Sequence, residues 1–192
     1  MNDTENIKLP PRLSQIMSET ARLNFTMASD TLTGCLLRAL SATKIAGKLL
    51  ELGTGTGVAT AWILDGMDAE ARLISVEIDE AVLEVAKKCL GDDLRVTFVH
   101  ADGGEWLRHA EPAQFDLIFA DSWPGKYTHL DEALRSLKRG GLYVIDDMLP
   151  QPNWPDGHAQ RADELISVLE NRNDLIITKL NWSTGVIIGT KT

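Results

Sequence analysis

The feature that most constrains the fold is a series of short apolar runs separated by segments with helical periodicity. Each run is followed within two residues by Gly or Asp. The five runs cover residues 48–52, 72–78, 95–100, 115–120 and 142–145. Near-continuous apolar runs between helices are typical of parallel strands that are buried on both faces of a sheet. The sequence therefore predicts an α/β fold with a doubly wound sheet.

The C-terminal part of the chain departs from this pattern. Residues 175–180 and 186–189 are two further strand-like runs, and the segment 181–185 between them ends in Gly185. This spacing predicts a hairpin. We therefore expect a seven-stranded, Rossmann-like sheet that is mostly parallel, with a C-terminal antiparallel hairpin that places one antiparallel strand near an edge.

The N-terminal segment is predicted to be helical. A short polar tail ends at Pro10-Pro11, and the helix that follows extends to about Met27. Ser29-Asp30-Thr31 predicts the N-cap of a second helix. We divide the chain into residues 1–28, a tail and helix near the mouth of the ligand site, and residues 29–192, the ligand-binding domain.

The charge balance restricts the partners. Among 192 residues, 28 are acidic and 19 are basic, so the formal net charge is −9. Nucleic-acid binding depends on Lys and Arg that neutralise phosphates, and no cluster of them occurs along the chain. The polar N-terminus lacks the apolar run of a secretory signal, and no stretch approaches the roughly 18 apolar residues of a membrane span. We expect a cytoplasmic protein with no nucleic-acid or membrane partner, in which Cys35 and Cys89 are reduced thiols.

A glycine-rich turn follows the first predicted strand. Residues 48–52 lead into Gly53, Gly55 and Gly57, and a helical segment begins directly afterwards. Glycines allow positive φ and a close approach of ligand to main chain, and ligands of doubly wound sheets bind at the carboxyl ends of the strands. The dinucleotide spacing G-x-G-x-x-G would need its third glycine at position 58, which is Val58. The spacing therefore disfavours a nicotinamide oxidoreductase.

Acidic residues end the next two strands. Glu77 lies twenty residues after Gly57 and is predicted to accept hydrogen bonds from both ribose hydroxyls of an adenosine ligand. Asp79 is predicted to cap the next helix. Asp102 ends the third strand, where it can accept from an adenine amino group.

This combination resembles the class I methyltransferases that use S-adenosylmethionine, over residues 29–190. The resemblance implies an enzyme with S-adenosylmethionine as cofactor, and it makes residues 29–192 the S-adenosylmethionine-binding methyltransferase domain. In this family the segment before the second helix crosses the donor. The implied cofactor-binding residues are Glu51, Gly53, Thr54, Gly55, Gly57, Glu77, Ile78, Asp102, Gly103, Asp121, Met27 and Ser29.

The fourth and fifth strand ends resemble the metal-dependent O-methyltransferases of the catechol and caffeoyl-CoA type. In those families an Asp after the fourth strand and an Asp-Asn pair after the fifth hold a divalent cation. Asp121 and Asp146 match, and Asp147 stands where Asn is usual. The resemblance implies a magnesium, manganese or calcium ion held by these three aspartates. Such a cation would bind a vicinal diol and lower the pKa of the attacking hydroxyl.

The acceptor site follows from the same segments. Trp123 and Tyr127 match the catechol branch in spacing, and Trp154 of the loop 149–158 offers a further flat wall for an aromatic acceptor. The family's general-base lysine would fall at Pro124. Lys126, two residues later, is the candidate base beside Asp121, and the alternative is that the metal alone acidifies the hydroxyl.

The sequence thus predicts an O-methyltransferase that moves a methyl group to a hydroxyl of a small, aromatic-type acceptor with a divalent cation. Two alternatives stay open. One is a metal-independent methyltransferase acting on nitrogen, carboxylate or protein, and the other is a non-catalytic S-adenosylmethionine-binding module. The expected partner is a small molecule, and a homodimer is left open.

Overall fold

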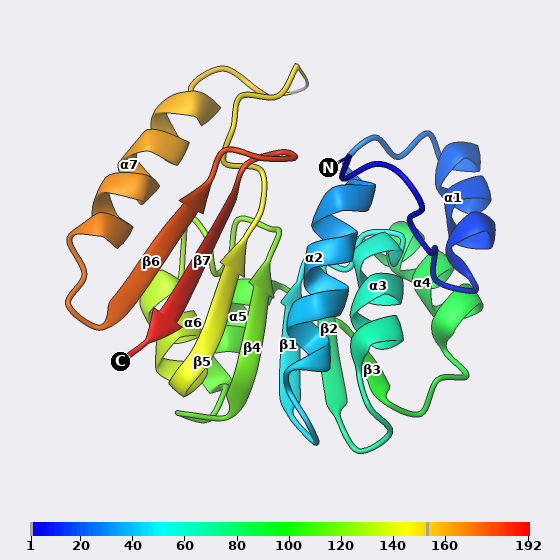
Figure 1. Ribbon diagram of the computed structural model, residues 1–192, viewed down its shortest axis with the longest axis horizontal. Helices are drawn as coiled ribbons and strands as arrows, with labels where there is room; N and C mark the ends of the chain where they lie inside the picture. Colours follow the sequence, from blue (N-terminus) through cyan, green and yellow to red (C-terminus); the bar gives the residue numbers. More distant parts are fainter. Residues whose placement is uncertain (1, 153) are drawn as a thin grey trace.

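The computed structural model describes residues 2–152 and 154–192, and it contains a seven-stranded sheet in the order β3-β2-β1-β4-β5-β7-β6 (Figure 1). The first five strands pair in parallel, and β7 is antiparallel to both β5 and β6. This confirms the predicted mostly parallel sheet with a C-terminal hairpin. The strands are β1 Lys48–Leu52, β2 Arg72–Glu77, β3 Val96–His100, β4 Phe115–Ala120, β5 Leu137–Ile145, β6 Leu175–Leu180 and β7 Val186–Lys191.

Helices cover both faces of the sheet. Apolar side chains of α2, α3 and α4 pack on one face, with α1 outside them against α3 and α4, while α5, α6 and α7 pack on the other face (Figure 1). The sheet is therefore buried on both sides, as its apolar runs predict. The helices are α1 Leu13–Arg22, α2 Thr31–Ala42, α3 Val58–Gly66, α4 Glu80–Leu90, α5 Gly103–His109, α6 Leu130–Ser136 and α7 His158–Glu170.

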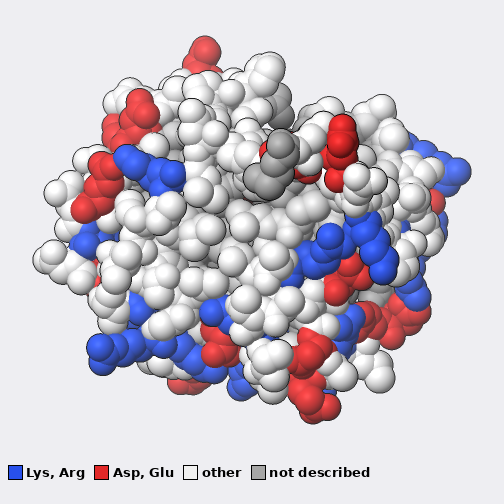
Figure 2. Space-filling model, viewed as in Figure 1, with Lys and Arg blue, Asp and Glu red and all other residues white. Residues whose placement is uncertain are grey.

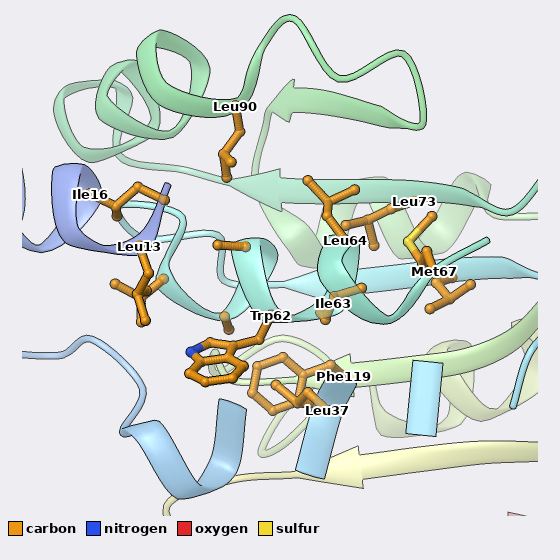
Figure 3. Packing of buried hydrophobic residues seen from close by; sticks show 14 of the residues in the cluster. Leu13, Ile16, Leu37, Trp62, Ile63, Leu64, Met67, Leu73, Leu90 and Phe119 are labelled. Carbon is orange, nitrogen blue, oxygen red and sulfur yellow. The ribbon is translucent and has the colours of Figure 1, made fainter. Parts of the chain in front are cut away.

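Close packing of α2 on α3 positions the turn that precedes α3. Trp62 is fully buried and lies beside Leu37 and Phe119 (Figure 3). Gly34 of α2 faces the indole, because a Cβ at Gly34 would lie 2.4 Å from its ring atoms. Only glycine permits this approach of the two helices.

Two predicted boundaries are wrong. The first helix ends at Arg22 and not near Met27, because Asn24 adopts a left-handed conformation (φ 52°) that stops it. The fifth strand begins at Leu137 and not at Leu142, because Leu137 pairs with Phe115 of β4. That pairing is a long-range contact that local composition does not reveal.

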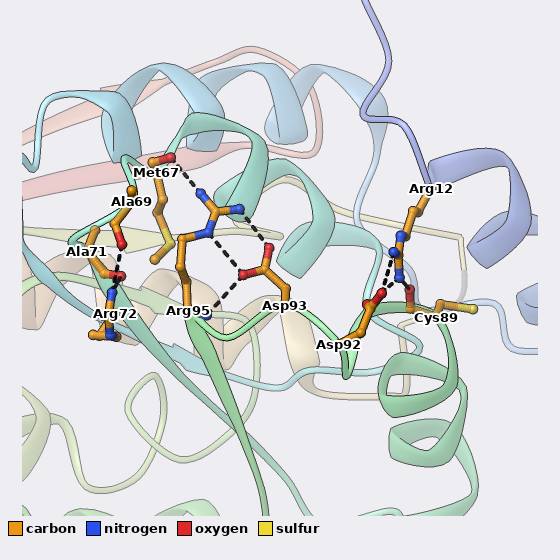
Figure 4. A network of polar contacts seen from close by, with 9 residues as sticks. All are labelled: Arg12, Met67, Ala69, Ala71, Arg72, Cys89, Asp92, Asp93 and Arg95. Carbon is orange, nitrogen blue, oxygen red and sulfur yellow. Dashed lines mark hydrogen bonds and ion pairs between the residues drawn. The ribbon is translucent and has the colours of Figure 1, made fainter.

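Ion pairs join the N-terminal segment to the domain. The guanidinium of Arg12 donates to the carboxylate of Asp92 and to the main-chain oxygen of Cys89 (Figure 4). Arg95 pairs in the same region with Asp93. A cavity of about 350 Å³ lies beside these pairs, away from the carboxyl ends of the strands.

The surface of Figure 2 shows basic side chains interspersed with acidic ones around a largely uncharged centre. Within residues 2–152 and 154–192, no helix has the length and apolar character needed to cross a bilayer. Cys35 and Cys89 are free cysteines.

Candidate active site

Two adjoining cavities lie where the strand order reverses between β1 and β4. The larger has a volume of about 480 Å³ and the smaller about 230 Å³. Both are lined by Met27, Asp121, Ser122 and Trp123. This is the position at which doubly wound sheets bind ligands, and Asp121 lies at the junction of the two cavities.

The glycine turn forms one wall of the larger cavity. Gly53 and Gly55 line it with left-handed φ values of 96° and 52°. A Cβ at Gly53 would lie 2.6 Å from the main-chain oxygen of Asp121, so the turn packs directly on the end of β4. A Cβ at Gly55 would lie 3.2 Å from the ring of Phe25, which lines the cavity from the segment between α1 and α2.

Glu77 lines the same cavity beside the glycine turn and is held by main-chain donors. Its Oε2 accepts from the N–H of Gly55 at 2.8 Å. Its Oε1 accepts from the N–H groups of Ile78 and Asp79 at 2.9 and 3.0 Å. Asp79 caps α4 as predicted, because its side chain accepts from Ala81.

Most predicted cofactor-binding residues line the larger cavity. They are Met27, Ser29, Gly53, Thr54, Gly55, Glu77, Ile78 and Asp121. The sequence reasoning missed further lining residues whose character gives no local signal. These are Phe25, Val58, Ala59, Asp79, Val82, Ser122 and Pro124. Trp123, which was predicted for the acceptor site, lines the larger cavity as well.

Glu51, Gly57, Asp102 and Gly103 line neither cavity, and the structure gives them other contacts. Glu51 is fully buried and accepts from the hydroxyls of Thr60 and Ser75. Burial raises the pKa of Glu51 to about 7.

Gly57 begins α3 with φ 92°, and Asp102 caps α5 by accepting from the N–H of Glu105 at 2.8 Å. A Cβ at Gly103 would meet Pro124. These three residues therefore shape the turns around the site.

Asp121 is the charged residue at the junction. Its Oδ2 accepts from the hydroxyl of Ser29 at 3.0 Å. Burial, together with the negative charge of Asp146, raises the pKa of Asp121 well above its usual range. A carboxylate whose pKa is raised accepts a proton more readily than an ordinary one.

Lys126 is buried, with 4% of its surface exposed, and it lines the smaller cavity. Its Nζ donates to the main-chain oxygen of Asp146 at 2.6 Å. Burial lowers the pKa of Lys126, and the negative charges of Asp121, Asp147 and Asp146 oppose that shift. The ammonium therefore lies within the field of all three carboxylates.

The three aspartates do not fit a divalent cation. Asp146 is buried outside the smaller cavity, and its Oδ1 accepts from the N–H of Asp147 and from the hydroxyls of Thr33 and Thr184. Across the described part of the chain, no group of three or more His, Cys, Asp or Glu side chains is arranged to hold a metal ion. Asp146 is bonded toward the β6–β7 hairpin, so the three predicted metal ligands are not grouped around one point.

Asp147 does line the smaller cavity, with φ 54°. This left-handed conformation is one that Asn and Asp tolerate best among residues with side chains. Burial raises the pKa of Asp147. Asp147 thus lines the smaller cavity together with Lys126.

Aromatic side chains surround the rest of the smaller cavity, as predicted for Trp123, Tyr127 and Trp154. The ring centroids of Trp123 and Tyr127 are 5.8 Å apart, and those of Trp154 and His158 are 4.4 Å apart. Asn153 of the same loop lies outside the described residues.

His158 was not predicted to belong to the site. Its Nε2 hydrogen-bonds to the hydroxyl of Tyr127 at 2.9 Å, and burial lowers its pKa. Burial also raises the pKa of Tyr127 to about 12. One sequence signal could have indicated that His158 belongs to the site. His158 follows Trp154 by four residues, at the start of α7.

A family model described as a methyltransferase domain matches residues 50–148. This range runs from β1 to just past Asp147 and includes the glycine turn, Glu77, Asp121 and Lys126.

A Mycobacterium tuberculosis H37Rv relative described as a probable O-methyltransferase is 30% identical over 116 residues, which are 58% of this chain and 50% of the relative. The chain therefore spans about half the length of the curated relatives that it matches.

Two solved structures share the fold over nearly the whole chain. The O-methyltransferase TomG of Streptomyces achromogenes, solved with S-adenosylmethionine, has a TM-score of 0.83 at 22% identity and covers 99% of this chain and 93% of its own. A Bacillus cereus O-methyltransferase, solved with S-adenosylhomocysteine, has a TM-score of 0.83 at 19% identity. The match covers 99% of this chain and 94% of the Bacillus cereus chain. At these identities the likeness shows the fold.

Proposed function

Because the chain belongs to the family of methyltransferase domains, we propose that it transfers a methyl group from S-adenosylmethionine to a hydroxyl of a small acceptor. The observation that carries this proposal is the pair of cavities that meet at Asp121. One has the glycine turn and acidic strand end suited to a nucleoside, and the other has aromatic walls suited to a flat acceptor. The O-methyltransferase names of the relatives support oxygen as the methylated atom.

In the proposed complex the donor fills the larger cavity. The main chain of the turn contacts the amino-acid portion, and Glu77 accepts from the ribose. Ile78 is 62% exposed and Met27 is 69% exposed, so both offer apolar surface that a bound donor would cover. The donor's methyl group then faces the junction at Asp121.

The acceptor occupies the smaller cavity, whose volume of about 230 Å³ suits a single-ring molecule. Trp123 and Trp154 supply flat apolar walls. The methyl–sulfur bond breaks as the methyl–oxygen bond forms, its electron pair stays on sulfur, and the sulfonium becomes a neutral thioether. Holding donor and acceptor in line is the main catalytic contribution.

The hydroxyl proton leaves during the transfer, and we assign it to Asp121. The sequence suggested Lys126 as the base, but its Nζ already donates to the main-chain oxygen of Asp146. Burial lowers the pKa of Lys126, and the three carboxylates around it oppose that shift. Lys126 is then the donor that stabilises negative charge on the acceptor oxygen. The pKa of Asp121, raised by burial, suits the role of base.

The test is isothermal titration with S-adenosylmethionine and S-adenosylhomocysteine, followed by turnover of a panel of single-ring phenols and catechols. We expect micromolar donor binding and formation of S-adenosylhomocysteine with at least one hydroxyl acceptor. Absence of donor binding would overturn the proposal. Donor binding with methyl transfer only to amines or carboxylates would show that the acceptor group is not a hydroxyl. Donor binding without any methyl transfer would favour a non-catalytic binding module.

A further inference from the structure

Charged side chains are concentrated at the smaller cavity and directly beside it. Three carboxylates, those of Asp121, Asp146 and Asp147, follow two neighbouring strands, and the buried ammonium of Lys126 lies in their combined field. Buried charges of one sign require a counter-charge. In this chain the side chain of Lys126 is in place to provide it.

The local backbone explains how Lys126 reaches this position. Gly125 has φ 85°, and a Cβ there would lie 2.4 Å from Leu52, so only glycine fits between the loop and β1. The hydroxyl of Tyr143 on β5 donates to the main-chain oxygen of Gly125 and fixes the turn. The Pro124-Gly125 turn therefore directs the next residue inward.

The contacts of Lys126 fix its amino group at the end of β5. Nζ donates to the main-chain oxygen of Asp146 at 2.6 Å and lies 5.2 Å from the ring centroid of Tyr127. The carboxylate of Asp146 is occupied by hydroxyls of α2 and the hairpin. One member of the aspartate set is thus turned away from the cavity, while an ammonium faces it.

Building on the proposed function, we propose that the Lys126 ammonium provides the positive charge that the sequence resemblance assigned to a divalent cation, so that this site binds its acceptor oxygen without a metal ion. A chelated cation favours two adjacent acceptor oxygens, whereas an ammonium needs only one to donate to. The substrate class that follows is a single-ring acceptor with one hydroxyl, and a vicinal diol is not required.

The experiment measures cation binding directly, without donor or acceptor. Mn²⁺, Mg²⁺ and Ca²⁺ are titrated into the wild-type protein, Lys126→Met and Lys126→Arg, with calorimetry and thermal unfolding as readouts. We expect no saturable binding by the wild type or by Lys126→Arg, which keeps the charge. Lys126→Met leaves the three carboxylates without a counter-charge, so we expect saturable binding of at least one cation and a rise in its melting temperature.

Saturable cation binding by the wild type that Asp147→Ala abolishes would overturn the proposal, as would a folded Lys126→Met that gains no cation affinity. If Lys126→Met fails to fold, the cation titrations of the wild type and of Lys126→Arg still test whether the site binds a metal ion. A second arm compares turnover of a phenol and a catechol in excess chelator. Turnover of the phenol unchanged by chelator supports the proposal, and its loss overturns it. Failure of donor binding would count against the proposed function alone, because the titrations contain no donor.

Discussion

The contribution of Glu77 to donor binding can be estimated from its hydrogen bonds. A carboxylate can accept about four hydrogen bonds, one for each lone pair. The carboxylate of Glu77 already accepts three, all from main-chain N–H groups. About one position remains for the ribose, so one full hydrogen bond and not two is expected. A bond to a charged acceptor contributes roughly 1.5–3 kcal/mol. We therefore expect Glu77→Ala to weaken S-adenosylhomocysteine binding by about 2 kcal/mol, roughly 30-fold in Kd.

The assay is isothermal titration of the product into the wild type, Glu77→Ala and the matched control Glu80→Ala. Glu80 is exposed in the first turn of α4 and lines neither cavity. Thermal unfolding of each variant separates lost binding from lost structure, because the N–H of Gly55 also loses its acceptor. A Kd for Glu77→Ala within twofold of the wild type would refute the reasoning. A loss near a thousandfold would also refute the one-bond estimate, because it would require both ribose hydroxyls on Glu77.

Three further outcomes follow from the site. Gly55→Val should abolish donor binding in a folded protein. Gly140→Val, at a residue that also has a positive φ (76°) but has nothing within 4 Å of the added Cβ, should bind the donor normally. Normal donor binding by Gly55→Val would contradict the cavity assignment. Turnover should rise with pH as the carboxyl of Asp121, whose pKa is raised, loses its proton. Asp121→Asn should lower kcat by about 100-fold or more. Turnover that does not change with pH would show that Asp121 is not the base. Burial raises the pKa of Asp146 from 3.8 to about 6, so the folded chain binds this proton more tightly, and stability should fall as pH rises from about 4 to about 6. In urea unfolding, the free energy of unfolding of Asp146→Asn should lack the part of its fall with pH that Asp146 causes. The same pH dependence in this variant and in the wild type would contradict the raised pKa of Asp146.

Much of the lining of the larger cavity could be predicted from the sequence because its signals are local. The glycines follow a strand directly, and Glu77 is recognisable as a strand end. Parallel strands then bring these positions to one edge of the sheet, and Asp121 joins them as the end of β4 beside β1. The same local signals did not show that Glu51 faces away from the larger cavity.

The acceptor half depends on contacts between distant segments. Thr184, which donates to Asp146, is 38 positions away in the chain, and Tyr127 is 31 positions from His158. No local pattern reveals which way such side chains point. The burial of Lys126 likewise depends on the packing of Gly125 against β1.

The place of β7 in the sheet also determines when the site can form. β7 follows β6 in the chain but lies between β5 and β6, so the edge of β5 remains unpaired during synthesis until residues 186–191 emerge. Domains generally fold as units as the chain leaves the ribosome. Thr184 arrives with the same hairpin, so until then the Asp146 carboxylate at the end of β5 has the hydroxyl of Thr33 but lacks that of Thr184. A nascent chain that already contains every residue of both cavities therefore has an open sheet edge and an incompletely bonded Asp146 carboxylate. Interruption of synthesis at that stage yields a species prone to aggregation.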